Sequence, residues 1–365
     1  MMKPVRVADY AELARAALPA RVWDYLDGGS GAEWTLRDNR AAFERITLRT
    51  RVLTDVATCD SRTTVLGAAL AAPIGVAPMA YHRLAHDDGE RATAAAAGAH
   101  GMLFVVSMFA SASYADIANA ATGPLWTQLY WLRDRAALLD VVRRAEDAGI
   151  SALVLTVDAP RIARRPRDLR NAFTVPADVR AVNLDAPVMA TSHVAEDGTS
   201  AIERHSRERF DPSLTWAELA WLRERSALPL ALKGILTAED AELAVAHGVD
   251  AIVVSNHGGR QLDGVPAAVD ALPEVADQVA GRVPVLVDGG VRTGADVLKA
   301  VALGASAVLV GRPVLWGLAH AGAEGAADVL AILREELAEA MALTGRPTLA
   351  DIDRSVLAVP RPRTR

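Results

Sequence analysis

Residues 229–260, PLALKGILTAEDAELAVAHGVDAIVVSNHGGR, contain one complete unit of the pattern that decides the fold. Two short, continuously apolar runs, PLALK (229–233) and AIVVS (251–255), flank an alanine-rich amphipathic stretch. Continuous apolar runs of this length are typical of strands that are buried on both faces of a parallel sheet. The stretch between them suits the helix that joins two parallel strands. The sequence therefore predicts a strand, a helix and a second, parallel strand in this region.

The same pattern recurs along the chain, with roughly 20–30 residues between most neighbouring runs, the length of one βα unit. The six further runs are PIGVA (73–77), MLFVVS (102–107), LWTQLY (125–130), ALVLTV (152–157), VPVLVD (283–288) and AVLVG, which ends at Gly311. Together the eight runs predict a (β/α)8 TIM barrel, which takes about 250 residues. The rival fold is a doubly wound sheet, which usually has about five or six strands. It is poorly supported, because no GxGxxG fingerprint follows the first run.

The chain is longer than a barrel requires, with 365 residues. We expect a single domain over 1–365, with a helical N-terminal extension at 1–70 and the barrel at 71–340. A long loop is predicted at 161–212, after the fourth run, and it is polar and rich in Pro and Asp. It follows the carboxyl end of a strand, where the active sites of barrels lie, so we expect it to act as a lid.

The composition limits the classes of protein to which the chain can belong. Hydrophobic residues make up 51% and charged residues 23%, which allows a large core and excludes a disordered or fibrous chain. The formal charge of −6 and the lack of basic blocks argue against a nucleic-acid partner. We find neither a membrane-spanning run nor a signal-peptide core, so we expect a cytoplasmic protein. Cys59 is the only cysteine, so we expect neither disulfides nor a metal site.

Two glycine-containing loops at the ends of the last two runs predict a phosphate site. Gly289, Gly290 and Gly311 let backbone N–H groups approach an anion closely. Arg292 and Arg312 add positive charge and forked hydrogen-bond donors. Barrels often bind phosphate after strands 7 and 8. The alternative is that the glycines only form tight turns, but two loops that each carry an arginine favour phosphate.

Four further residues near strand ends are candidates for chemistry. His257 can accept a proton near neutral pH, although a lone histidine is usually an ordinary surface residue. Arg260 can bind a substrate carboxylate through two hydrogen bonds. Lys233 ends an apolar strand, where it is either a fixed cation beside a group that becomes negative or a side chain whose tip reaches solvent. Asp158 either orients and charge-balances a histidine or braces a loop.

Seven motifs, in this order along nearly the whole chain, resemble the family of FMN-dependent 2-hydroxy acid oxidases and dehydrogenases. They are WDYLDGGSGAEWTLRDNRAAF (23–43), PIGVAPMAYHRLAHDDGE (73–90), TQLYWLRDR (127–135), LTVDAPRIARRPRDLRN (155–171), SNHGGRQLDG (255–264), DGGVRTGADVLKAVALGA (288–305) and VLVGRPVLWGLA (308–319). The resemblance implies that FMN is the cofactor whose phosphate the two glycine-containing loops bind.

The resemblance also implies roles for individual residues. His257 matches the catalytic base and Asp158 its carboxylate partner, while Lys233 matches the lysine near the flavin edge that becomes negative on reduction. The residues that match the substrate site are Tyr25, Tyr130, Arg165, His257 and Arg260, of which Tyr130 also counts among the catalytic residues. The residues that match the FMN site are Pro78, Met79, Ala80, Ser107, Gln128, Thr156, Lys233, Ser255, Asp288, Gly289, Gly290, Arg292, Gly311 and Arg312.

The activity implied is oxidation of an (S)-2-hydroxy acid to the 2-oxo acid, with O2 reduced to H2O2. A quinone-linked dehydrogenase is the alternative, but its members carry an apolar patch in the fourth loop, whereas residues 176–212 are polar here. Two further alternatives are an isomerase of isoprenoid diphosphates, which would need more phosphate-binding residues, and a phosphate-binding barrel without activity. Against the isomerase, the predicted two arginines and two tyrosines at the mouth suit one carboxylate. A barrel without activity would not need His257, Asp158 and Lys233 together.

The substrate is predicted from two departures and one further resemblance. Met79 and Phe109 stand where glycolate oxidases usually have threonine and tryptophan, and APMAYHRLAH (77–86) resembles the 4-hydroxymandelate oxidases of glycopeptide antibiotic biosynthesis. We therefore expect 4-hydroxymandelate or mandelate to be oxidised to the corresponding benzoylformate. L-lactate, glycolate or another aliphatic acid is the second choice. Family resemblance also implies a homotetramer.

Overall fold

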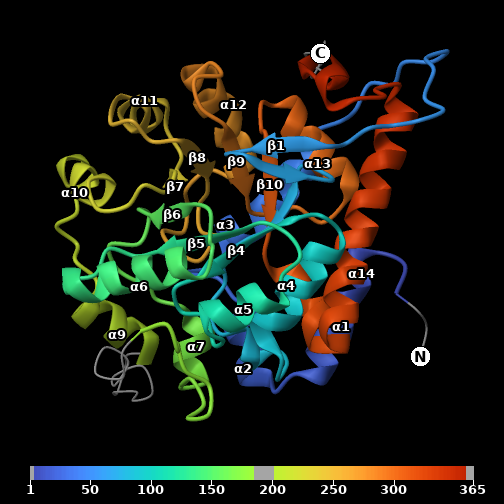
Figure 1. Cartoon of the computed structure of the whole chain (residues 1–365). Coiled ribbons are helices and arrows are strands. Elements are labelled where there is room, and N and C mark those ends of the chain that lie inside the picture. Colours follow the sequence, from blue (N-terminus) through green and yellow to red (C-terminus); the bar gives the residue numbers. More distant parts are fainter. Residues whose placement is uncertain (1–3, 185–200, 359–365) are drawn as a thin grey trace.

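The computed structural model describes residues 4–184 and 201–358. Eight parallel strands form a closed barrel in the order β10-β3-β4-β5-β6-β7-β8-β9 (Figure 1). The strands are β3 (Ile74–Val76), β4 (Leu103–Ser107), β5 (Leu125–Leu129), β6 (Leu153–Thr156), β7 (Leu230–Ile235), β8 (Ala251–Val254), β9 (Val285–Asp288) and β10 (Ala307–Val310). Each lies within or overlaps one of the eight apolar runs. The predicted (β/α)8 barrel is therefore confirmed.

Helices surround the barrel and connect successive strands. They are α4 (Gly89–Ala99), α5 (Tyr114–Ala120), α6 (Arg135–Asp147), α10 (Leu219–Arg223), α11 (Ala238–Ala246), α12 (Ala268–Val279), α13 (Gly294–Ala302) and α14 (Arg312–Thr344). Several begin at a side-chain cap: the Thr237 hydroxyl accepts from the Asp240 N–H, and the Thr293 hydroxyl from the Asp296 N–H. Such caps satisfy backbone N–H groups that have no partner within the helix. Single 3-10 turns complete the described part: η1 (His82–Leu84), η2 (Trp216–Glu218), η3 (Leu349–Asp351) and η4 (Arg354–Val356).

The N-terminal region expected to precede the barrel contains α1 (Val7–Ala17), α2 (Ala20–Asp27), α3 (Trp34–Arg45) and the hairpin β1 (Thr63–Val65) and β2 (Ala68–Leu70). Helix α1 packs along α14 (Figure 1). Val65 and Leu70 of the hairpin belong to the same buried cluster as inward-facing residues of the barrel strands. The hairpin therefore closes one end of the barrel, and the opposite end carries the site.

In its described parts, the segment predicted as a long loop contains two helices, α7 (Pro166–Arg170) and α9 (Ala201–Arg209). Its end is attached to the loop after β5, because Phe210 forms an isolated antiparallel bridge with Leu132 and Arg135 pairs with Asp211 at 2.6 Å. The predicted lid falls partly on residues 185–200, which lie outside the described residues.

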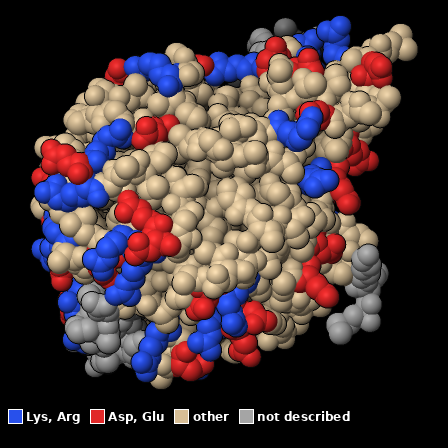
Figure 2. All heavy atoms as spheres, in the orientation of Figure 1, with Lys and Arg blue, Asp and Glu red and all other residues tan. Residues whose placement is uncertain are grey.

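The surface carries charges of both signs. On the face drawn in Figure 2, they are interspersed near the edges, and the centre has few charged side chains. Among residues 4–184 and 201–358, we find no helix both long and apolar enough to cross a membrane.

Candidate active site

The alternation of side chains along the strands places a ring of polar groups at the carboxyl end of the barrel. Side chains two residues apart on a strand share a face. Inward-facing apolar residues of six strands are each followed, two positions later, by a polar or glycine residue. The pairs are Val105 and Ser107, Trp126 and Gln128, Val154 and Thr156, Ala231 and Lys233, Leu286 and Asp288, and Leu309 and Gly311.

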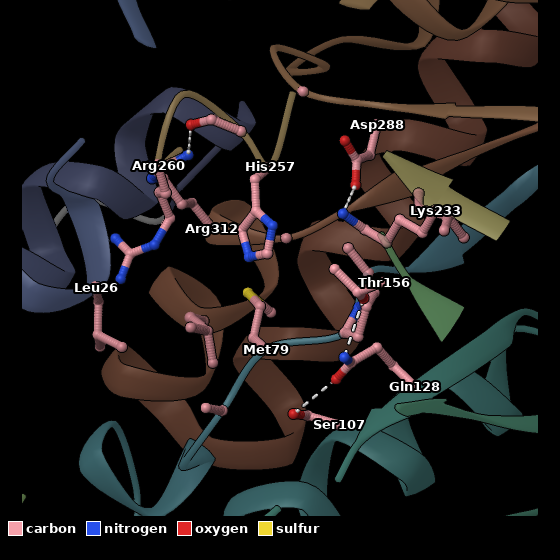
Figure 3. Close-up of a pocket in the computed structure, with 18 of the residues that line it drawn as sticks. Leu26, Met79, Ser107, Gln128, Thr156, Lys233, His257, Arg260, Asp288 and Arg312 are labelled. Carbon is pink, nitrogen blue, oxygen red and sulfur yellow. Dashed lines mark hydrogen bonds and ion pairs between the residues drawn. The ribbon is translucent and has the colours of Figure 1, made fainter. Parts of the chain in front are cut away.

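A cavity of about 1260 Å³, counting its open mouth, lies over this ring (Figure 3). Most of the predicted site residues line it: Tyr25, Pro78, Met79, Ala80, Ser107, Gln128, Tyr130, Thr156, Arg165, Lys233, His257, Arg260, Asp288, Gly289, Gly290, Arg292, Gly311 and Arg312. Two do not. Asp158 and Ser255 lie behind the wall, where they contact His257 and Lys233.

His257 and Asp158 form a close pair although the strands that carry them are separated by β7. The His257 Nδ1 lies 2.9 Å from Asp158 Oδ1, and Nε2 lies 3.4 Å from the Tyr130 hydroxyl at the cavity. Gly234 permits this approach, because a Cβ there would lie 2.5 Å from the Asp158 Cβ. Burial lowers the pKa of His257, although Asp158 opposes the shift. The imidazole is therefore held neutral, with Nε2 toward the cavity as a proton acceptor.

Two guanidinium groups flank this pair at the mouth of the cavity. Arg165 is only 7% exposed, and its Nη1 lies 3.5 Å from Asp168. Arg260 donates to the carbonyl oxygens of Tyr25 and Gly28, each at 2.8 Å. Burial and then the charge of Arg165 lower the pKa of Arg260 to about 9. An anion bound between these arginines would be stabilised by both.

On the other side of the cavity, Lys233 is buried, and Figure 3 shows it beside Asp288. Its Nζ donates to Ser255 Oγ at 2.8 Å and lies 3.1 Å from Asp288 Oδ2. Burial alone would lower the pKa of Lys233, but Asp288 and Asp158 raise it overall. Lys233 is therefore a fixed cation in the cavity wall and not a side chain that reaches solvent.

A row of hydrogen bonds crosses the ends of β4, β5 and β6. Ser107 Oγ donates to Gln128 Oε1 at 3.2 Å, and Gln128 Nε2 donates to Thr156 Oγ1 at 3.0 Å. The row fixes the orientation of the Gln128 amide and lines the floor of the cavity. It can offer donors and acceptors to a planar polar ring.

The loops after β9 and β10 hold two arginines without carboxylate partners. Within the described residues, neither Arg292 nor Arg312 forms an ion pair. Arg312 donates to three backbone carbonyl oxygens and Arg292 to one. Burial lowers the pKa of each to about 10. Gly290 has a positive φ of 91°, and a Cβ there would lie 2.0 Å from the Asn39 carbonyl oxygen.

The geometry can be compared with known proteins at this point. A family model described as FMN-dependent dehydrogenase matches residues 14–359. The chain belongs to the FMN-dependent dehydrogenase family. It is 48% identical over 352 residues to the peroxisomal (S)-2-hydroxy-acid oxidase of Oryza sativa subsp. japonica, covering 96% of this chain and 95% of the relative. It is 46% identical to the L-lactate oxidase of Nostoc sp., covering 97% and 98%.

Solved structures of mandelate oxidase are also similar to this member of the FMN-dependent dehydrogenases. One contains (S)-4-hydroxymandelic acid; it has a TM-score of 0.93 and 46% identity and covers 97% of this chain and 98% of that chain. A second, a variant with (S)-mandelic acid, has a TM-score of 0.89 and 43% identity, covering 99% and 100%. The family predicted from the sequence motifs, and FMN as its cofactor, are thereby confirmed.

The residues of this chain fit an FMN-dependent dehydrogenase. Arg292 and Arg312 are half-buried cations that form no ion pair among the described residues, as a phosphate site requires. Asp288 Oδ1 is buried, and we find no hydrogen-bond partner for it among the described residues. A ligand hydroxyl could satisfy it, because an unsatisfied buried acceptor is costly. The cavity thus offers both a cradle for a phosphate and an acceptor for a polyol chain.

Sequence reasoning did not predict that Phe210 and Tyr81 join Tyr130 and Phe109 in an aromatic wall of the cavity. The Phe210 ring lies 4.5 Å from that of Tyr130 and 6.1 Å from that of Phe109, which in turn lies 6.2 Å from Tyr81. Phe109 had been noted only as a departure from glycolate oxidases. Phe210 comes from the end of the polar segment and enters the wall through its bridge with Leu132. An isolated aromatic residue in a polar segment was the only available signal.

Proposed function

We propose that this protein is an FMN-dependent oxidase of (S)-mandelate or (S)-4-hydroxymandelate. The overall reaction converts the 2-hydroxy acid and O2 to the 2-oxo acid, a benzoylformate, and H2O2. One arrangement carries the proposal: a buried histidine–aspartate pair and two guanidinium groups face one cavity that also has an aromatic wall. The activities in the names of the relatives, (S)-2-hydroxy-acid and L-lactate oxidation, agree with the oxidation predicted from sequence.

His257 is the proposed base. Its Nδ1 is held at 2.9 Å by Asp158, so Nε2 is the nitrogen free to take a proton from the substrate. The Asp158 carboxylate stabilises the imidazolium that results, because an opposite charge at this distance favours the protonated form. Tyr130, 3.4 Å from Nε2, orients the same group. Its own pKa is raised by burial, so it remains a hydrogen-bond donor.

Arg165 and Arg260 bind the substrate carboxylate in this proposal, and the Tyr25 ring holds both. The Arg260 guanidinium lies 5.2 Å and that of Arg165 5.9 Å from the Tyr25 ring centre. Arg165 Nε is buried, and we find no partner for it among the described residues. A carboxylate would supply the missing acceptor. This grip places the Cα–H and hydroxyl of the acid near His257.

FMN would be held by Arg292, Arg312 and the adjoining glycines at its phosphate, by Asp288 at its ribityl chain, and by the row of Ser107, Gln128 and Thr156 at its ring. When bound, FMN supplies the two-electron acceptor and passes the electrons to O2. Lys233 provides a fixed positive charge in the wall where that acceptor gains negative charge. Ser255 holds the Lys233 ammonium in place from behind.

The aromatic wall favours an aryl substrate. Rings in contact at about 4.5–7 Å attract one another beyond the area they bury, and Phe109, Phe210 and Tyr81 offer such contacts. A short aliphatic acid would leave these rings uncovered. L-lactate and glycolate remain the second choice, since relatives named for both acids share more than two fifths of their residues with this chain.

A peroxide-coupled screen of glycolate, L-lactate, (S)-mandelate and (S)-4-hydroxymandelate tests the proposal. We expect the highest kcat/KM for one of the two aryl acids. A higher value for L-lactate or glycolate would contradict the aryl assignment, and activity that requires a quinone would contradict the oxidase assignment. The homotetramer, the cytoplasmic location and the part in antibiotic biosynthesis stay predictions; light scattering on the purified protein tests the first.

A further inference from the structure

Gln261 belongs to the motif around His257 and has been given no role so far. Its side chain is only 6% exposed. Its Nε2 donates to the carbonyl oxygens of Asp158 at 2.9 Å and Arg161 at 2.8 Å, and its Oε1 accepts from the Ala163 N–H at 3.0 Å. An amide has two donor hydrogens, and both are used here on one loop. All three of these side-chain hydrogen bonds of Gln261 thus reach the loop after β6.

This bridge joins the two loops that carry the proposed chemistry. The loop after β8 holds His257 and Arg260, and the loop after β6 holds Asp158 and Arg165. Strand β7 lies between β6 and β8, so no ladder hydrogen bonds set the position of one loop relative to the other. Gln261 makes that connection directly. It holds the backbone of Asp158 and a segment just before Arg165.

The backbone of Gln261 is itself anchored by the link between α2 and α3. Ser30 is 2% exposed; its hydroxyl donates to the Gln261 carbonyl oxygen, and its N–H donates to that of Gly259 at 2.9 Å. The next residue, Gly31, donates to the Arg164 carbonyl oxygen at 3.2 Å. The short link between α2 and α3 therefore contacts both loops. It fixes the backbone of Gln261, so the side-chain amide cannot move away with one loop alone.

We propose that Gln261 is a positioning residue that sets two spacings at once, that of His257 to Asp158 and that of Arg260 to Arg165. The inference rests on the proposed function for the roles of those four residues. It adds that base strength and carboxylate binding depend on one buried side chain that touches neither substrate nor cofactor. Loss of the amide would leave three backbone groups unpaired and let the loops separate.

The test uses two neutral variants of the FMN-loaded enzyme. Gln261→Met keeps the length but removes the polar groups, and Gln261→Asn keeps the polar groups but is one methylene too short. Both should lower kcat and weaken binding of phenylacetate, a carboxylate without the reacting hydroxyl, measured by flavin absorbance. Misplacement by about 1 Å can cost about 10²-fold, so we expect kcat/KM to fall on that order. FMN content and sulfite affinity should stay unchanged.

A matched control is Gln278→Met, since Gln278 is an exposed glutamine on α12 that donates only to Glu242 at 2.8 Å. It should change neither kcat nor phenylacetate affinity. The proposal is overturned if Gln261→Met and Gln261→Asn keep both quantities, or if only one of the two changes, because a common link must move both. If one variant does not fold, the other decides. If the wild type oxidises none of the four acids, the proposed function fails, while phenylacetate affinity still reports on Gln261.

Discussion

The two halves of the cavity balance their charges in different ways. In the half formed after β6, β7 and β8, His257 lies 2.9 Å from Asp158, and Lys233 lies 3.1 Å from Asp288. With the exception of Arg260, these groups have side-chain partners within the protein: Asp158 for the neutral His257 imidazole and Asp288 for the Lys233 ammonium. A buried charge is costly unless it is paired, so this half is stable when no substrate is bound.

The other half, after β9 and β10, is not balanced by the protein. Arg292 and Arg312 hydrogen-bond only to backbone carbonyl oxygens among the described residues, and burial lowers the pKa of both. Such a site is completed by a permanent anion. The comparison teaches that the two neighbouring cations without ion-pair partners indicate the resident cofactor, whereas paired groups indicate a site that must remain organised between turnovers.

Arg260 is the exception within the paired half. Arg165 has Asp168 at 3.5 Å, while the Arg260 guanidinium donates only to carbonyl oxygens among the described residues. Among the described residues, the Arg260 guanidinium therefore forms no ion pair with a carboxylate. Its single positive charge matches the single negative charge of a monocarboxylate substrate.

The largest effect is expected from His257→Ala. A general base contributes typically about 10²–10⁴-fold, so the rate of anaerobic flavin bleaching by the aryl acid should fall by that order. FMN content should not change, because His257 lies in the half that does not hold the phosphate. Bleaching at the wild-type rate would show that another group takes the proton.

Lys233→Met tests whether Lys233, in the half with paired groups, lies next to the ring of the bound flavin. Sulfite adds to flavins with a gain of negative charge, and hydrogen bonds to charged groups contribute about 1.5–3 kcal/mol. Sulfite affinity, read from flavin absorbance, should fall about 10- to 150-fold. FMN should still be retained through Arg292 and Arg312. Equal sulfite affinity in wild type and variant would show that Lys233 does not face the flavin.

Arg260→Lys tests whether Arg260, the exception among the paired groups, binds the substrate carboxylate through two hydrogen bonds. A lysine keeps the charge but cannot reproduce the planar fork of the guanidinium. We expect kcat/KM for the aryl acid to fall by about tenfold, the equivalent of about 1.4 kcal/mol. The same change at Arg165 should act in the same direction. Unchanged kcat/KM in both variants would exclude bidentate recognition of the carboxylate.

The smallest effect concerns pH. Burial lowers the folded-state pKa of His257 below its ordinary value of 6.5, so the neutral, proton-accepting form persists as the pH falls below that value. The acid limb of kcat/KM should therefore lie below pH 6.5 in the wild type. Asp158→Asn removes a group that raises this pKa, so it should move the limb to still lower pH. A limb above 6.5 in the wild type would contradict the assignment.

Much of this arrangement could be predicted from the sequence. The eight apolar runs predicted the barrel because each strand is buried on both faces, and the residues after them formed the site because parallel strands end on one side. The contributions of Phe210 and Gln261 could not be predicted in this way. Phe210 enters through a bridge with Leu132, and Gln261 acts through backbone groups of residues about 100 positions away, which no local pattern encodes. Ser255 was expected to contact FMN, but it lies behind Lys233.

The most direct test of the difference between the two halves is the affinity of the apoprotein for FMN and for riboflavin, which lacks the phosphate. Flavin fluorescence gives both dissociation constants for the wild type, Arg312→Ala and His257→Ala. The account predicts that the wild type and His257→Ala bind FMN about 10- to 150-fold more tightly than riboflavin, and that Arg312→Ala loses most of this preference. Equal affinities in the wild type, or an undiminished preference in Arg312→Ala, would contradict it.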